Sequence, residues 1–277
     1  MSDERVVAVT MVKDEVDIVA RTVSHMATQA DHVIVADNMS TDGTRDVLND
    51  LARDLPLTVV DDLEVGYHQS AKMTELALQA RLNHHADWIV PFDADEWWYS
   101  PFGRIADILN SVGGRQWLVM EAALYDHVAT GKDPAIDEQP DPCIRLGWRR
   151  TEPAPMPKVA CRWREDLVIE MGNHGARYVG GATKFESQLV IRHFPYRSIE
   201  QLIRKIRNGA AAYAATDLDP TFGAHWRQWG EALDDPNRGT EWVEDLFRTW
   251  YYREEPAGWL TVQGEKHPPL IFDPAIL

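Results

Sequence analysis

The chain has 277 residues, enough for one large α/β domain with an appendage, and its 44% of hydrophobic residues can supply a sizeable core. Its 44 acidic side chains outnumber the 28 basic ones and give a formal net charge of −16, which argues against nucleic acid as a partner. Only two cysteines occur, and neither a signal peptide nor a long apolar run is present, so we expect a cytoplasmic protein without a membrane span.

Strands and helices alternate through the first part of the chain. Apolar β-branched runs predict strands over residues 5–11, 32–36, 56–60 and 88–92, and helical spacing predicts helices over residues 14–27, 44 to about 53, and 70–83. This order implies parallel strands with right-handed crossovers, whose ligands gather outside the carboxyl ends of the strands. Polar clusters follow all four strands, at residues 11–15, 37–40, 61–69 and 93–96. We therefore expect the ligand site at that edge of the sheet.

The fourth strand runs into three closely spaced carboxylates, those of Asp93, Asp95 and Glu96. Alternation along a strand points Asp93 and Asp95 the same way and turns Ala94 back. Such a pair repels by roughly 1 kcal/mol at ~4 Å in water and by about 4 kcal/mol at an intermediate dielectric, so it favours a bound cation. Mn²⁺ or Mg²⁺ is the predicted partner, with positions left for water and substrate phosphates. A solvated acidic turn is the alternative.

The pattern is looser in the second half of the chain. Strands are predicted over residues 116–123, 158–163, 167–171 and 189–193, and a surface excursion over residues 130–157. His174 lies in the turn Gly-Asn-His-Gly, and His193 ends the last of these strands. A capping box then predicts a helix whose basic face includes Arg197 and Lys205. That face indicates either a diphosphate site or a solvated surface.

The chain is predicted to divide at residue 214. Residues 1–99 form its first half, residues 100–214 its second half, and residues 215–277 a helical extension. Within the extension, one helix is predicted over residues 241–252, with Trp242, Leu246 and Trp250 facing inward. The extension could pack against the rest of the chain, form contacts in a homo-oligomer, or act as a lid over an acceptor molecule.

Five phrases occur in order: VKDEVDIVARTVSHM, ADNMSTDGT, DWIVPFDADEWW, GNHG and HFPYRSIEQLIRKIRNG. As an ordered set they resemble family 2 glycosyltransferases of the GT-A fold, over residues 5–214. The resemblance implies an α/β fold: a Rossmann-like, mostly parallel sheet flanked by helices, a smaller mixed α+β half on the acceptor side, and a helical tail. In that fold, residues 1–99 are expected to be the nucleotide-binding half and residues 100–214 the acceptor and catalytic half. It also implies a nucleoside-diphosphate sugar donor, a divalent metal, and sugar transfer to a small-molecule or glycan acceptor with inversion.

The resemblance also implies roles for particular residues. The metal motif falls on Asp93 and Asp95, with His193 as a third ligand and His174 as its rival. The position that binds the base falls on Asp37 and Asn38, although many members have two aspartates there. The residues predicted to bind the nucleotide are Met11, Lys13, Glu15, Asp37, Asn38, Lys72, Asp93, Ala94, Arg197 and Lys205.

Three residues are candidates for the base that activates the acceptor hydroxyl: Glu170, His174 and Asp126. Two other functions compete with glycosyl transfer. A sugar nucleotidyltransferase would carry a Gly-rich loop after the first strand, where this chain reads MVKDE. A non-catalytic module that binds nucleotide sugars is the second alternative, and the retained Asp93, Asp95 and His193 count against it.

Overall fold

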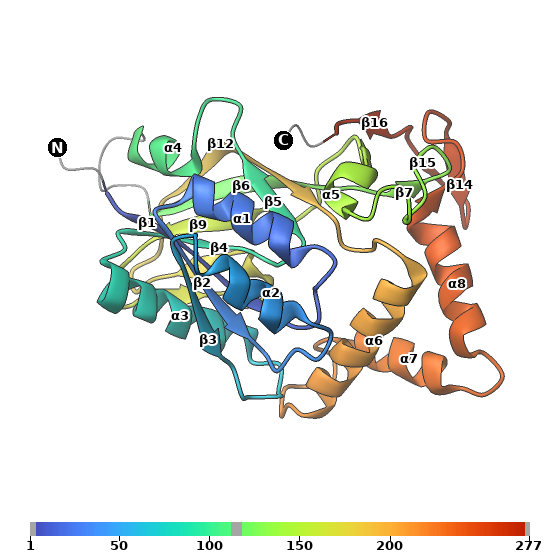
Figure 1. The fold of residues 1–277 in the computed structure, drawn as a ribbon, viewed down its shortest axis with the longest axis horizontal. Coiled ribbons are helices and arrows are strands. Elements are labelled where there is room, and N and C mark those ends of the chain that lie inside the picture. Colours follow the sequence, from blue (N-terminus) through green and yellow to red (C-terminus); the bar gives the residue numbers. More distant parts are fainter. Residues whose placement is uncertain (1–3, 112–117, 275–277) are drawn as a thin grey trace. The chain divides into compact units, whose positions relative to one another are not determined.

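The computed structural model describes residues 4–111 and 118–274, and Figure 1 shows their course. The chain forms two compact units. The first comprises residues 4–63, 68–111, 118–125 and 153–193, and the second comprises residues 64–67, 126–152 and 194–274. The predicted boundary after residue 214 coincides with the end of a helix inside the second unit.

The first unit is built on an eight-stranded sheet in the order β3-β2-β1-β4-β9-β6-β12-β5. Its strands are β1 (Val6–Val12), β2 (His32–Asp37), β3 (Leu57–Asp61), β4 (Trp88–Pro91), β5 (Glu96–Tyr99), β6 (Val119–Asp126), β9 (Lys158–Arg162) and β12 (Lys184–His193). The pairs β1–β2, β1–β4 and β2–β3 are parallel, as the sequence predicts. Antiparallel pairing appears further along, where β9 joins β4 to β6 and β12 pairs with β5.

Helices cover both faces of this sheet because alternate residues of its strands point to opposite sides. Val6 and Ala8 face one core, together with α1 (Val19–Gln29), α2 (Thr44–Leu51) and α4 (Ile105–Ser111). Val7 and Val9 face the other core, together with α3 (Gln69–His84) and the short hairpin of β10 (Val168–Ile169) and β11 (Ala176–Arg177). The predicted α/β class with helix-flanked strands is confirmed, and the helices can be followed in Figure 1.

The first helix begins later than predicted. Residues 13–18 form a turn before α1 starts at Val19. Asp14 has a φ of 54°, in the left-handed region that a right-handed helix cannot include. The predicted inner face of the third helix is confirmed, since Met73, Leu76, Ala77 and Ala80 are all buried. Residues 116 and 117 of the predicted strand 116–123 lie outside the described residues.

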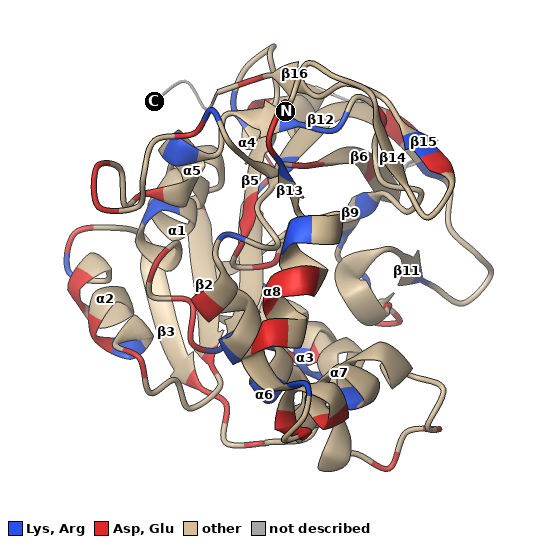
Figure 2. Ribbon diagram, turned by 90° about the vertical axis from the view of Figure 1, so that its right-hand side faces the viewer, with Lys and Arg blue, Asp and Glu red and all other residues tan. Residues whose placement is uncertain are grey.

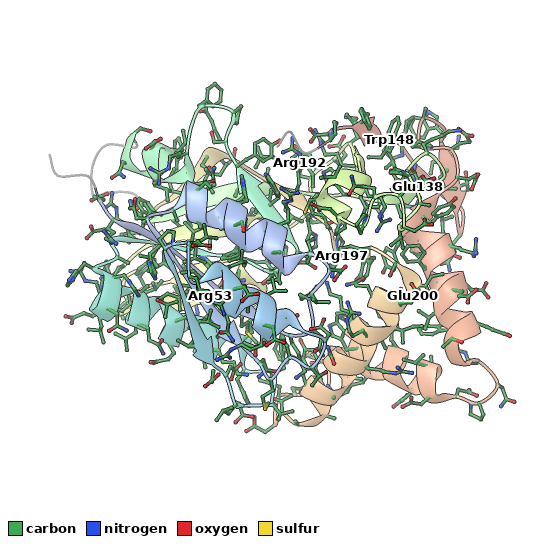
Figure 3. All side chains as sticks on the ribbon, in the orientation of Figure 1. Arg53, Glu138, Trp148, Arg192, Arg197 and Glu200 are labelled. Atoms are coloured by element: carbon green, nitrogen blue, oxygen red, sulfur yellow. The ribbon has the colours of Figure 1, made fainter. Side chains whose placement is uncertain are left out.

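The second unit is largely helical. Its helices are α5 (Pro142–Arg145), α6 (Ile199–Ala214), α7 (Ala224–Asp234) and α8 (Gly239–Trp250), and its strands are β7 (Ala129–Thr130), β8 (Trp148–Arg149), β13 (Tyr252–Arg253), β14 (Leu260–Val262), β15 (Glu265–His267) and β16 (Ile271–Phe272). The predicted cap of α6 is confirmed, because the Ser198 hydroxyl accepts from the Gln201 amide at 3.1 Å. Figure 3 labels Arg197 and Glu200 beside this helix start. None of the described helices is long and apolar enough to cross a membrane.

Two expectations about the tail were wrong. The helix α7 was not predicted, since the sequence pattern indicated a single helix in the extension. In α8, Val243 and Phe247 are the buried residues, whereas Trp242, Leu246 and Trp250 are only half-buried. The indole rings lie at the margin of the helix contact because Val243 and Phe247 already fill its centre.

Within the first unit, His25 of α1 makes stability depend on pH. Its ring stacks on Trp97 with centroids 3.9 Å apart, and its Nε2–H donates to the Trp98 carbonyl at 2.6 Å. Burial lowers the pKa of His25 from 6.5 to about 4, and the nearby Arg192 adds to this, while the hydrogen bond opposes it. As pH falls below 6.5, His25 becomes protonated in the unfolded chain but stays neutral in the folded chain until about pH 4.

We therefore expect the free energy of unfolding to fall by about 3 kcal/mol from His25 alone as pH drops through this window. Urea unfolding between neutral pH and the acid limit measures it. His25→Gln, which keeps a donor for the Trp98 carbonyl but does not titrate, should flatten this part of the profile. An identical pH dependence in the wild type and the variant would contradict the assignment.

Candidate active site

The loops that follow β1 and β2 are fastened to each other. The Asp14 carboxylate accepts from the Thr41 amide at 2.7 Å, and the Asp14 amide donates to the Ser40 hydroxyl at 2.9 Å. Asp42 accepts from the Val16 amide at 3.1 Å and from the Thr44 amide at 3.0 Å. The STDGT part of the second phrase is therefore largely structural, because its side chains satisfy the backbone of the neighbouring loop.

The remaining polar residues at this edge form a connected network. Lys13 Nζ donates to the Asn38 carbonyl at 2.7 Å, and Asn38 Nδ2 donates to the Asp62 carboxylate at 3.0 Å. The same carboxylate accepts from Lys72 Nζ at 2.6 Å. Lys13, Asn38 and Asp62 each follow one of three adjacent parallel strands, and Lys72 lies in the first turn of α3. The predicted nucleotide candidates Lys13, Asn38 and Lys72 therefore do come together. Asp62 joins them, although it was not predicted.

Asp37 lies in the same edge, with 5% of its surface exposed. Its carboxylate accepts from the Ser40 amide at 3.3 Å and from Arg45 at 3.4 Å. Arg45 also pairs with Asp61 at 2.6 Å. Of the other candidates, Met11 is half-buried against the sheet core, and the Glu15 amide donates to Thr44 Oγ1 at 2.8 Å.

A buried lysine lies at the centre of the acidic motif. Lys158 Nζ, at the start of β9, lies 2.5 Å from Asp93 Oδ2 and 2.9 Å from Glu96 Oε1. Glu96 is fully buried, and its other oxygen accepts from the Asp93 amide at 3.1 Å and from Trp98 Nε1 at 2.9 Å. Burial raises the pKa of Glu96, an effect that Lys158 opposes. Burial also lowers the pKa of Lys158, but the two carboxylates outweigh it and hold that pKa above its ordinary value.

Further contacts hold the rest of the motif. Asp93 Oδ1 accepts from Asn173 Nδ2 at 2.9 Å and from Gln69 Nε2 at 3.5 Å. Both oxygens of Asp93 therefore already have protein donors. The Ala94 carbonyl accepts from Thr22 of α1 at 2.7 Å, which ties the motif to the helix layer.

Asp95 and His193 approach each other at the end of this motif. The antiparallel register of β5 and β12 places His193 opposite Glu96, and His193 Nε2 lies 3.6 Å from Asp95 Oδ1. Among residues 4–111 and 118–274, no group of three or more His, Cys, Asp or Glu side chains is arranged to hold a metal. A carboxylate and an imidazole still suit Mn²⁺, which can take its remaining ligands from water and substrate phosphates. The pair Asp95 and His193 fits a metal in this way, whereas the carboxylate of Asp93 is directed to Lys158.

Two of the candidate bases lie in the same unit. His174 Nδ1 donates to the Pro157 carbonyl at 2.9 Å, which leaves Nε2 as the acceptor nitrogen of the neutral ring. Burial lowers the pKa of His174 below its ordinary value and so favours that neutral form. Glu170 is paired with Arg177 at 3.2 Å, and 43% of its side chain is exposed. Of the two, His174 has the environment of a proton acceptor.

The other candidates belong to the second unit. Asp126 lies 3.7 Å from Arg150. Arg197 is 1% exposed and donates to the Phe194 carbonyl at 3.0 Å, while Lys205 Nζ donates to the Pro195 carbonyl at 3.2 Å. The helix α6 also contains Arg204, Lys205 and Arg207, and Figure 2 colours such basic residues blue on the ribbon. Their role toward a diphosphate stays a prediction.

A polar hollow of about 570 Å³ lies elsewhere in the first unit. It is lined by Glu4, Arg5, Asp31, Arg104, Ala106, Asp107, Asn110 and Ser111. Arg5 and Asp31 precede β1 and β2, so this hollow is at the amino ends of the strands, opposite the acidic motif. The chemistry of the acidic motif is therefore not located there.

Three residues of the acidic site were not predicted: Gln69, Lys158 and Asn173. Lys158 carried a usable signal, since it directly precedes the apolar run Val159, Ala160 and Cys161 of a predicted strand. A lysine is almost never fully buried unless it is paired, so its partners had to be carboxylates. Gln69 and Asn173 offered no comparable signal.

Comparisons with known proteins bear on this site. Residues 7–108 match the family model described as "Glycosyl transferase family 2". Among solved structures, S. aureus TarS 1-349 in complex with UDP is similar with a TM-score of 0.41 and 10% identity, over 83% of this chain and 71% of that one. A second S. aureus TarS structure has a TM-score of 0.37 and 10% identity, over 83% of this chain and 44% of that one.

A third solved structure is glucosyl-3-phosphoglycerate synthase from Mycobacterium tuberculosis, in complex with Mn²⁺, UDP and glucosyl-3-phosphoglycerate. Its TM-score is 0.32 with 16% identity, over 44% of each chain. No curated protein matches the chain. The matched segment runs from β1 into α4 and contains both the fastened loops and the acidic motif. Residues 7–108 thus match the model of the family that the ordered motifs resemble.

Proposed function

We propose that this protein transfers a sugar from a nucleoside-diphosphate sugar to an acceptor hydroxyl, with inversion at the anomeric carbon and with Mn²⁺ or Mg²⁺. The observation that carries the proposal is the approach of His193 to Asp95, at 3.6 Å. Asp95 lies between β4 and β5, within residues 7–108, the segment that matches the family model. A metal held there would stabilise the negative charge that develops on the leaving diphosphate.

Each part of the site has a role in this reaction. Asp37 and Asn38 contact the base or the ribose, since they follow β2 at the edge where ligands of parallel sheets bind. Lys13 and Lys72, which meet the same network, offset phosphate charge. His174 accepts the proton of the acceptor hydroxyl through Nε2, because Nδ1 is occupied by the Pro157 carbonyl.

The deciding experiment is incubation with UDP-, GDP-, CDP- and ADP-sugars and Mn²⁺, followed by mass spectrometry. Release of a nucleoside diphosphate that EDTA suppresses would support glycosyl transfer. Pyrophosphate release from a nucleoside triphosphate and a sugar phosphate would instead support a nucleotidyltransferase. Donor binding without turnover, in the presence of a panel of acceptors, would support a binding module.

Asp37→Ala is expected to weaken nucleoside-diphosphate affinity by about 1 to 3 kcal/mol, because it leaves a buried polar group of the ligand unpaired. Calorimetry with Mn²⁺ measures the change. Asp61→Ala is the matched control, since Asp61 pairs with the same Arg45 but has a side chain that is 66% exposed. Equal losses in the two variants would show that Arg45, and not a ligand contact of Asp37, carries the effect.

A further inference from the structure

Lys158 occupies an unusual position in the acidic motif. Its ammonium lies between two carboxylates, 2.5 Å from Asp93 and 2.9 Å from Glu96, and its side chain is 5% exposed. These contacts join the start of β9 to Glu96 and to Asp93, which lies 65 positions earlier in the chain. The ammonium therefore meets the carboxylates at the place where the sequence predicts a divalent cation.

The partners of Asp93 make this arrangement specific. One carboxylate oxygen contacts Lys158, and the other accepts from Asn173 and Gln69. Gln69 is itself oriented, because its Oε1 accepts from the Gly172 amide at 2.7 Å. An ammonium offers three donors and one positive charge, which suffices to hold two converging carboxylates without a metal.

We propose that Lys158 is a built-in cation that takes the place of a divalent ion between Asp93 and Glu96. It acts as a positioning residue, and it restricts the metal ligands of the protein to Asp95 and His193. This inference rests on the proposed function. A site with only two protein ligands binds a divalent ion weakly until the donor diphosphate supplies further oxygens, so metal and donor bind together.

The proposal predicts a gain on mutation. Lys158→Met removes the ammonium between the carboxylates of Asp93 and Glu96. The repulsion between these two carboxylates then favours the binding of another cation. We expect the variant to bind Mn²⁺ about tenfold more tightly than the wild type, or better, in the absence of nucleotide. The measurement is titration of the free Mn²⁺ signal by electron paramagnetic resonance, at about pH 8 so that the carboxyl groups do not share a proton instead.

Two further variants make the experiment decisive. Lys158→Met combined with Glu96→Gln removes both buried charges together, so it protects folding, and it still releases Asp93 to bind Mn²⁺ beside Asp95. Arg162→Met is the matched control, because Arg162 lies at the other end of β9, is 8% exposed and pairs with Glu4. It should lower stability and leave Mn²⁺ affinity unchanged.

Tighter Mn²⁺ binding in the single variant, or in the double variant if the single one does not fold, supports the proposal. Unchanged or weaker Mn²⁺ binding in the folded variant overturns it, as does an equal gain in Arg162→Met. The proposed function is tested separately, by release of a nucleoside diphosphate from a donor sugar. The comparison of Mn²⁺ affinities between variants does not depend on that release, so one can fail without the other.

Discussion

Asp95→Asn should reduce metal-dependent turnover by about 100-fold or more, since a metal at this position supplies several kcal/mol of stabilisation to the leaving diphosphate. The side chain is 4% exposed and lies 3.6 Å from His193, so the amide fills the same space but withdraws the anionic ligand. Calorimetry of nucleoside-diphosphate binding, with and without Mn²⁺, gives a readout that does not depend on turnover. The enhancement of binding by Mn²⁺ should disappear in the variant.

Three companion variants sharpen this prediction. His193→Ala should weaken metal affinity and turnover together, whereas His174→Ala should lower turnover and spare the metal. Asp87→Asn is the control carboxylate, because Asp87 precedes β4 at the opposite edge of the sheet and contacts Arg5 and Arg81. An unchanged Mn²⁺ effect in Asp95→Asn would refute the role of Asp95.

Glu96→Ala should cost about 3 to 5 kcal/mol of unfolding free energy, the range for breaking a buried ion pair by removing one partner. Glu96 is fully buried, and its loss strips Lys158 of one carboxylate and the Trp98 indole of its acceptor. It also frees the Asp93 amide that fixes the turn of the motif. Chemical unfolding followed by tryptophan fluorescence measures the change.

Glu75→Ala provides the control for that loss. Glu75 is an exposed glutamate of α3 in the same unit, so its removal should change stability by no more than about 0.5 kcal/mol. Glu96→Gln should fall between the two, because the amide oxygen still accepts from Trp98 but carries no charge opposite Lys158. A cost for Glu96→Ala as small as that for Glu75→Ala would contradict the buried-pair interpretation.

The sequence predicted most of the sheet that supports the site. Strands and helices up to residue 92 follow from periodicity, because alternate residues of each strand face opposite cores and each helix has one apolar stripe. The positions of Asp37 and Asp93 at strand ends follow from the same pattern. The delayed start of α1 does not, since it depends on hydrogen bonds between two loops: the Asp14 carboxylate accepts from the Thr41 amide, and the Asp42 carboxylate accepts from the Val16 amide.

By itself, the sequence determined the order of strands and helices up to residue 92, the edge at which polar side chains gather, and the family whose model residues 7–108 match. These are local properties, carried by residue spacing and short phrases. Only the tertiary structure decided that His193 stands beside Asp95 and that Lys158 meets Asp93. Both contacts join segments far apart in the chain, and the pairing of β5 with β12 and of β9 with β4 sets them. Strand pairing is a choice among distant partners that residue spacing along one segment does not encode.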